Sequence, residues 1–166
     1  MKKLKIYLDT SAIGYLDEET SPKEMADMQK LWGLIKSDEY SAVISDVTFD
    51  EIRQNKNANK VETLLNYIAE ISYDRISINE EVNKIAEMVK QNGLIAADKH
   101  YNDRIHIGCA ISAECDIMVS MNFKHLVNVT TIRGVRAISV LESNRSIDIV
   151  SPVSLIYQEG NDQNDG

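Results

Sequence analysis

The sequence predicts an α/β fold, a three-layer α/β/α sandwich around a central, mainly parallel sheet of five strands. Two features support this prediction. Five short runs of apolar or β-branched residues alternate along the chain with longer stretches in which apolar residues recur at helical spacing. Strands that alternate with helices pair in parallel through right-handed crossovers, so that helices cover both faces of one sheet.

The predicted strands are four or five residues long and mostly apolar, as expected for strands covered on both faces. They are Leu4–Leu8, Ala42–Ser45, Arg75–Ile78, Ile117–Ser120 and Ile147–Val150. A single domain over residues 1–157 accommodates all of them, and a chain of 166 residues is long enough to bury a sizeable core. Residues 158–166 are polar and rich in Gly, Asn and Asp, which predicts a disordered tail.

The segments between the strands carry helix start and stop signals. The stretch Ser21-Pro22-Lys23-Glu24 fits a capping box with proline at the first helical position. Asn79 is a candidate cap for a helix that is closed by Gly93. Further helices are predicted over Val61–Ile71, Asn102–Cys115 and Ile132–Leu141.

Composition narrows the class of protein. No apolar run approaches the ~18 residues of a transmembrane helix, and the N-terminus has no signal-peptide pattern. Cys109 and Cys115 lie in an apolar stretch and indicate reduced thiols in a cytoplasmic protein rather than a disulfide or a zinc site. The net charge of −8 argues against a broad basic surface that binds nucleic acid by phosphate neutralisation alone. It suits a basic partner or a site whose acids hold cations.

Acidic residues follow the first two predicted strands and open the nearly apolar helix. Asp9 ends the first strand, Glu51 follows the second, and Asp103 lies in the first turn of the helix. In a parallel α/β sheet the ligand site lies beyond the carboxyl ends of the strands, so these elements converge there. Three carboxylates packed together repel unless a cation intervenes, and hard oxygen ligands favour Mg²⁺ or Mn²⁺.

Each of these acids also has a purely structural interpretation. Asp9 can cap the short helix that follows it. Glu51 stands three residues after Thr48, so the two can form a structural capping box. Asp103 can interact favourably with the dipole at the start of its helix. The metal-site hypothesis therefore depends on the three acids lying together.

Four segments of the sequence occur in a familiar order. They are "IYLDTSAIGYL", "AVISDVTFDEI", "NDRIHIGCAISAECDIMVSMNFKHLVN" and "IDIVSPVSLI". Together they resemble the PIN-domain family, and within it the small single-domain members related to VapC-like toxins. The resemblance runs from Lys3 to about Ile156, and its most specific part is D-x-x-H-I-x-x-A followed by D-x-x-V-S-x-N-F-K-H-L.

The resemblance implies a PIN-like, metal-dependent ribonuclease with an acidic pocket. Matched by position, Asp9 and Asp103 would hold Mg²⁺ or Mn²⁺ directly. Glu51 would bind the ion or orient a water on it. Ser11, or Thr10, would steady that water or the scissile phosphate through its hydroxyl.

This chain departs from the family pattern at Asn122, where the family's fourth acid usually stands. Asp116, six residues earlier, is either a supporting site residue or a structural cap at the edge of the sheet opposite Asp9. The departure leaves open whether a second metal binds and whether the protein is catalytically weak or inactive. His106 either reaches the pocket or packs in the core, and His125 either contacts RNA phosphate or is solvated.

Three functions are compatible with these residues. The leading hypothesis is a Mg²⁺- or Mn²⁺-dependent endoribonuclease. If this enzyme is the toxin of a type II toxin–antitoxin pair, its antitoxin would block the acidic pocket. The second is a binding module of the same fold that binds a metal or a protein partner without turnover. The third, a response-regulator-like receiver, is disfavoured because the first strand ends in the lone Asp9 and no lysine follows at the expected later strand end until Lys124.

The sequence lacks the motifs of several other enzyme classes, and it offers one apolar face for a homodimer. The chain has no P-loop, no dinucleotide glycine fingerprint, no G-x-S-x-G elbow and no Cys/His nucleophile pairing. The apolar face around Met25, Met28 and Trp32 suits a homodimer interface, but core packing explains it more simply.

Overall fold

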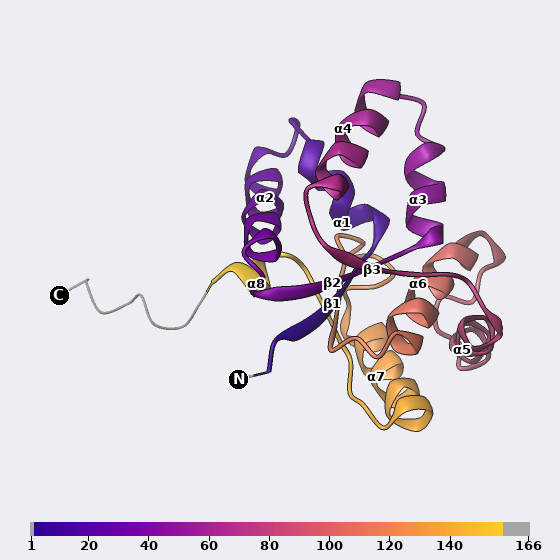
Figure 1. Cartoon of the computed structure of the whole chain (residues 1–166). Coiled ribbons are helices and arrows are strands. Elements are labelled where there is room, and N and C mark those ends of the chain that lie inside the picture. Colours follow the sequence, from indigo (N-terminus) through magenta and orange to yellow (C-terminus); the bar gives the residue numbers. More distant parts are fainter. Residues whose placement is uncertain (1, 158–166) are drawn as a thin grey trace.

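The structure is a computed structural model that describes residues 2–157, and it has the predicted three-layer α/β/α architecture (Figure 1). The middle layer is a parallel sheet of five strands in the order β3-β2-β1-β4-β5. The strands are β1 (Leu4–Leu8), β2 (Tyr40–Ser45), β3 (Tyr73–Ile76), β4 (Ile117–Val119) and β5 (Asp148–Val150). The predicted tail, residues 158–166, lies outside the described residues.

Helices connect the strands and cover both faces of the sheet (Figure 1). They are α1 (Thr10–Gly14), α2 (Pro22–Lys36), α3 (Asp46–Arg53), α4 (Ala58–Ala69), α5 (Glu80–Gln91), α6 (Tyr101–Ser112), α7 (Val129–Ser143) and α8 (Val153–Ile156), with short 3-10 turns at Tyr15–Asp17 and Asp98–His100.

Alternation along the central strand divides the core into two clusters. Tyr7 of β1 points into a cluster built mainly from α5, α6 and α7, whereas Ile6 and Leu8 point into a cluster built mainly from α1, α2 and α4. Successive side chains of a strand face opposite sides, so one strand feeds both cores. Both faces of β1 are therefore covered, so a polar site has to lie at an end of the strand.

Most helix signals in the sequence are confirmed, and two are corrected. Asn79 caps α5 by accepting from the backbone N–H of Val82 at 2.9 Å, and Gly93 follows the helix at a φ of 76°. α2 begins at Pro22 as predicted, but Ser21 makes no side-chain cap hydrogen bond. The Thr48–Glu51 capping box is wrong as well, because α3 begins directly after β2 and is capped by Ser45.

Other predictions are settled by burial and register. Met28 and Trp32 are buried in the core, which favours the packing explanation of that face. The strand β3 lies two residues earlier than predicted, because Tyr73–Ile76 is the stretch that pairs with Ala42–Ser45 of β2. Among the helices of residues 2–157, none has the length and apolar character needed to cross a membrane.

Candidate active site

The strands β2, β1 and β4 end side by side in polar residues. Ser45 ends β2, Asp9 directly follows β1, and Ser120 directly follows β4. β1 pairs with both neighbours, so these positions belong to one edge of the sheet, here called the carboxyl edge. The helix α3 contacts both α1 and α6, which brings two further helices to this edge.

Asp9 is buried, with 2% of its surface exposed. Its Oδ1 accepts from the backbone N–H of Ala12 at 2.8 Å and from the Ser11 hydroxyl at 2.7 Å. Asp9 thus caps α1, as one of its two interpretations predicted, and it also faces the candidate site. Burial raises the pKa of Asp9, although the nearby His106 and hydrogen bonds from Ser120, Ala12 and Ser11 act in the opposite direction.

Glu51 lies on α3 and is held by two side chains from other elements. Its Oε1 accepts from the Thr10 hydroxyl at 2.9 Å and lies 2.5 Å from Nε2 of His106. Burial alone would raise the pKa of Glu51, but the contact with His106 and hydrogen bonds from Thr10 and Asn102 lower it overall. Glu51 is therefore ionised at neutral pH and fixed in orientation.

His106 connects Glu51 to the interior of the protein. It is 2% exposed, and its Nδ1 lies 2.6 Å from the Tyr7 hydroxyl, which lies 2.7 Å from the Ser45 hydroxyl. Burial raises the pKa of Tyr7 well above its ordinary value, so this hydroxyl keeps its proton. When Tyr7 donates to Nδ1, the N–H at Nε2 is the one that His106 donates to Glu51.

The sequence alone left open whether His106 reaches the pocket or packs in the core. The spacing of Asp103 and His106 on one helix face was a local signal that both reach the site. The other members of its hydrogen-bonded chain are Tyr7, Ser45 and Glu51. They come from β1, β2 and α3, and no local sequence pattern predicts that they contact His106. The buried polar chain Ser45–Tyr7–His106–Glu51 is thus a feature that only the fold assembles.

Asp103 lies in the first turn of α6 and is less buried than Asp9. Its side chain is 23% exposed, and its Oδ2 lies 3.7 Å from Nδ1 of His100. The pKa of Asp103 is raised, first by burial and also by the charge of Glu51, while His106, His100 and His125 act to lower it. The ring of His100 contacts that of His125, with 3.9 Å between centroids and a tilt of 44° between the ring planes, so two histidines lie beside Asp103.

These three carboxylates lack the partners that most buried charges have. Among residues 2–157, no lysine or arginine nitrogen lies within 4.0 Å of Asp9, Glu51 or Asp103, and the ion pairs of these acids within the described residues are with His106 and His100. The carboxylate of Asp46 stands at the same edge but pairs with Arg75 at 2.5 Å. Asp9, Glu51 and Asp103 therefore differ from Asp46, which lies at the same edge and has a cationic partner.

The hydroxyl and amide groups predicted for the site are used within the protein. Ser11 donates to Asp9 and accepts from the backbone N–H of Met121 at 2.9 Å. Asn122 accepts from the backbone N–H of His125 through Oδ1 at 3.1 Å. Ser11 therefore fixes Asp9, and Asn122 fixes the loop after β4.

Asp116 is not brought to this site. It directly precedes β4, at the opposite edge of the sheet, and β1 and β4 align so that Asp116 lies level with Lys5. Four residues of β1 separate that level from Asp9, or ~13 Å. Asp116 accepts from the backbone N–H of Lys5 at 2.9 Å and pairs with Arg145 at 2.8 Å. Asp116 is therefore a structural residue of the opposite edge, and its expected supporting role in the site is wrong.

The three carboxylates do not form the shared ion site expected from the sequence. Of the described residues, no group of three or more His, Cys, Asp or Glu side chains is arranged to hold a metal ion. The physical reason is that Glu51 is engaged by Thr10 and His106. Asp9 and Asp103 remain compatible with a hard cation, because Mg²⁺ is commonly held by one or two carboxylates together with water and substrate phosphate.

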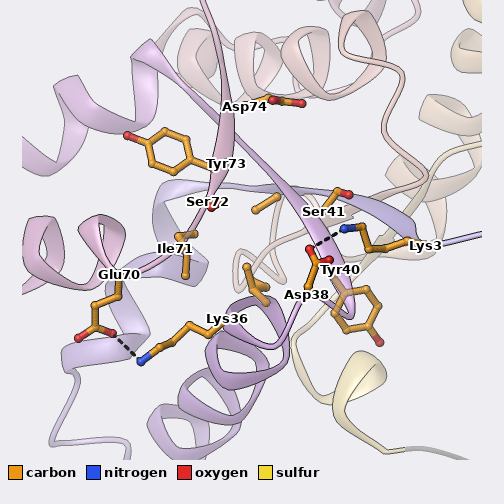
Figure 2. A pocket seen from close by; sticks show the side chains of 12 residues that line it. Lys3, Lys36, Asp38, Tyr40, Ser41, Glu70, Ile71, Ser72, Tyr73 and Asp74 are labelled. Carbon is orange, nitrogen blue, oxygen red and sulfur yellow. Dashed lines mark hydrogen bonds and ion pairs between the residues drawn. The ribbon is translucent and has the colours of Figure 1, made fainter.

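A separate hollow of about 430 Å³ lies at the amino ends of β1, β2 and β3. Figure 2 shows two ion pairs along this hollow, Lys3 with Asp38 and Lys36 with Glu70, and the side chain of Asp74 apart from them. None of the residues predicted for the site lines this hollow. It is therefore distinct from the candidate active site.

Thiol chemistry is disfavoured throughout this structure. Cys109 and Cys115 are free and buried, as the sequence predicted. Burial raises the pKa of each thiol to about 12, so neither forms a thiolate at neutral pH.

Comparisons with known proteins support the fold. No family model matches the sequence, and no curated protein matches it. The structure is similar to a chain of "Crystal structure of VapBC2 from Rickettsia felis bound to a DNA fragment from their promoter", with a TM-score of 0.55 and 14% identity over 89% of this chain and 99% of that chain. At this identity the likeness shows the fold, and it confirms the predicted PIN-like α/β/α class.

Proposed function

We propose that the protein is a Mg²⁺- or Mn²⁺-dependent endoribonuclease. The observation that carries this proposal is the group of Asp9, Glu51 and Asp103 at the carboxyl edge, without a lysine or arginine partner. The ordered sequence motifs resemble those of VapC-like PIN ribonucleases, and the structural neighbour is a VapBC2 complex. Both support the same reaction class.

Asp9 and Asp103 are the carboxylates proposed to hold the cation. Each has a raised pKa, which indicates an ionised form that its surroundings do not fully stabilise. A bound divalent ion supplies positive charge that polarises a phosphodiester and lowers the pKa of water. Asp9 is rigid because two hydrogen bonds hold it, and Asp103 is the more exposed of the pair, on the side open to substrate.

Glu51 is proposed to orient the attacking water. Its lowered pKa keeps it ionised as a hydrogen-bond acceptor, and Thr10 and His106 fix its direction. Pre-set acceptors and donors lower a barrier because they need no reorganisation during the reaction. His106 touches Glu51 and not the substrate, so we assign it as a positioning residue. Ser11 takes the same role for Asp9, since its proton is donated to that carboxylate.

The three carboxylates also indicate what kind of protein would inhibit the nuclease. A partner that inserts a lysine or arginine among these carboxylates would supply the charge that this chain lacks there, and it would exclude the cation. We therefore propose that the chain acts as the nuclease of a two-protein system with a basic antitoxin segment. The VapBC2 neighbour is consistent with such a pair.

RNA cleavage by the full chain tests the proposed function. We expect cleavage of RNA with Mn²⁺, loss of cleavage with a chelator, and a loss of at least about 100-fold in Asp9→Asn. Asparagine can still cap α1, so Asp9→Asn should remain folded. The matched control is Asp38→Asn, an exposed aspartate of the other edge, which should cleave as the wild type does. Cleavage that persists in Asp9→Asn, or without metal, would exclude this proposal.

A second function is favoured by one specific observation. Asn122 is neutral where the family usually has an acid, and its side chain is committed to the loop after β4. A protein with this site would bind a cation or a basic partner without turnover. Calorimetry separates the alternatives: Mn²⁺ binding that depends on Asp9, without any RNA product, would favour the binding module.

A further inference from the structure

A small hollow adjoins the candidate active site on the side of β4 and β5. Its volume is about 140 Å³, and it lies between α2 and the segments that follow those two strands. Met121, Phe123 and Pro152 form apolar walls, and Lys23, Glu24 and Asp27 of α2 add charged groups. The hollow therefore offers both an apolar surface and hydrogen-bonding groups.

Two hydrogen bonds connect a residue of this hollow to Asp9. The backbone N–H of Met121 donates to the Ser11 hydroxyl at 2.9 Å, and that hydroxyl donates to Asp9 Oδ1 at 2.7 Å. A ligand that lies against Met121 is thus two hydrogen bonds from a carboxylate of the candidate active site. Occupancy of the hollow and of the site by one extended molecule is consistent with this spacing.

Phe123 presents an aromatic ring at the mouth of the hollow. It is 54% exposed, whereas the other phenylalanine, Phe49, is buried. The loop that carries Phe123 is held by hydrogen bonds, since Asn122 Oδ1 accepts from His125 and the Asn122 carbonyl accepts from the backbone N–H groups of Leu126 and Val127, each at 3.0 Å. The ring is therefore pre-organised outside the core, where it can stack on a flat partner.

We propose that this hollow binds an unpaired nucleobase of the RNA substrate, with Phe123 as the stacking surface. The inference rests on the proposed function and adds to it a subsite for one base, formed by the hollow between α2 and the segments after β4 and β5. Bases in single strands expose their faces to aromatic side chains, whereas bases in a duplex do not. A protein of net charge −8 gains little from phosphate contacts alone, so base stacking supplies affinity that its surface charge does not.

The carboxylates of the hollow predict which bases are preferred. Glu24 and Asp27 are hydrogen-bond acceptors, so they favour bases whose edges carry N–H donors. The guanine edge offers an imino and an amino donor, and cytosine and adenine offer an amino donor. Uracil places two carbonyl acceptors beside its single donor and is disfavoured. We expect guanine to bind best and uracil worst.

Binding of defined RNA oligonucleotides to the full chain tests the subsite. In the Asp9→Asn background, which prevents cleavage, fluorescence anisotropy gives the affinity for labelled single strands that differ at one base. Phe123→Ala should weaken binding by about 5- to 150-fold, the usual effect of losing one base–aromatic stack. Phe123→Trp should retain binding, and Phe123→Leu should lose it. The matched surface control is Leu141→Ala on α7, a residue that is 77% exposed, with unchanged affinity expected.

A spectroscopic signal separates stacking from general loss of structure. The fluorescence of a single 2-aminopurine in the RNA should be quenched on binding to the Asp9→Asn protein and restored when Phe123→Ala is added. In cleavage-competent protein, Phe123→Ala should raise KM for single-stranded RNA more than it lowers kcat.

The outcomes distinguish this subsite from the proposed function. Cleavage that is metal-dependent but indifferent to Phe123→Ala overturns the subsite and leaves the nuclease intact. Phe123-dependent binding of single strands without any cleavage keeps the subsite and removes the nuclease. Equal effects of Phe123→Ala on single-stranded and duplex RNA also overturn the subsite, and the hollow would then be assigned to a protein contact.

Discussion

At the amino edge of the sheet, three acidic side chains are paired with lysine or arginine, whereas the three candidate site acids at the carboxyl edge are not. Asp38 pairs with Lys3, Glu70 with Lys36 and Asp116 with Arg145. Asp9, Glu51 and Asp103 are instead contacted by hydroxyls, amides and histidines. One sheet therefore carries three paired acids at its amino edge and, at its carboxyl edge, three acids that can accept an external cation.

The difference teaches where stability and function reside in this fold. Paired charges at the surface contribute little to stability, and each already has an opposite charge beside it. Asp9 and Asp103 have no lysine or arginine partner and keep raised pKa values, so a bound cation would stabilise their ionised forms. Asp46 sharpens the comparison, because it stands at the carboxyl edge and is nevertheless paired with Arg75. Position alone therefore does not define the site.

Apart from the proposed metal ligands, the largest effect on cleavage is expected from removal of the histidine that positions Glu51. His106→Gln should lower RNA cleavage by about 10- to 100-fold, the usual cost of losing a group that orients a functional residue. It should also raise the pKa of Glu51, because His106 is the main group that lowers it against the effect of burial. The pH profile of cleavage and carboxyl ¹³C chemical shifts measure both quantities.

Tyr7→Phe provides the graded control for His106. It removes the hydroxyl that contacts Nδ1 and leaves the ring packed in the core. We expect a smaller loss of cleavage and little change in the Glu51 pKa. If His106→Gln changes only the melting temperature, and neither the pH profile nor the Glu51 pKa, His106 is merely structural.

A medium effect on stability, with no effect on chemistry, is expected at the amino edge. Asp116→Ala leaves Arg145 and the backbone N–H of Lys5 without their acceptor, and it should lower the free energy of unfolding by about 1–2 kcal/mol. Cleavage per folded molecule should be unchanged. Urea denaturation and cleavage assays on the same sample check both statements, and a loss of cleavage beyond the loss of folded protein would return Asp116 to the site.

The smallest effect has the opposite sign and is expected at Asp103. Its pKa is raised in the folded state, so ionisation at neutral pH disfavours the folded protein. Asp103→Asn should therefore raise the free energy of unfolding by up to about 1 kcal/mol at pH 7 in the presence of a chelator. The gain should vanish as the pH falls below about 3.9, where the carboxyl group is protonated in both states.

Urea denaturation across this pH range measures the Asp103 effect. A loss of stability in Asp103→Asn at pH 7 would show that a partner within the protein already stabilises the carboxylate. That result would contradict the contrast between the two edges.

Much of the fold could be predicted because its signals are local. The apolar run Leu4–Leu8 predicts a strand, and Asn79 predicts the start of a helix, without reference to the rest of the chain. Asp9, Glu51 and Asp103 could be placed at one edge because parallel strands and their following helices share a direction. Failures arose where two local patterns competed, as at Thr48, which lies within α3 because Ser45 already caps the helix.

The partners of the site residues could not be predicted from local patterns. Glu51 and His106 are 55 positions apart, and Tyr7 and His106 are 99 apart. Their contacts depend on how α3 and α6 pack beside β1. Gly108 of α6 shows how close such packing is, since a Cβ there would meet the Val82 carbonyl oxygen at 2.6 Å. Such approaches follow from the assembled fold and not from residue spacing.

Anomalous diffraction from a crystal grown with Mn²⁺ tests the central claim most directly. We predict a manganese peak bound by the carboxylates of Asp9 and Asp103, with Glu51 still hydrogen-bonded to His106. Manganese at other acids only, or none near positions 9 and 103 at saturating Mn²⁺, would contradict the proposal that these unpaired carboxylates form a cation-dependent nuclease site.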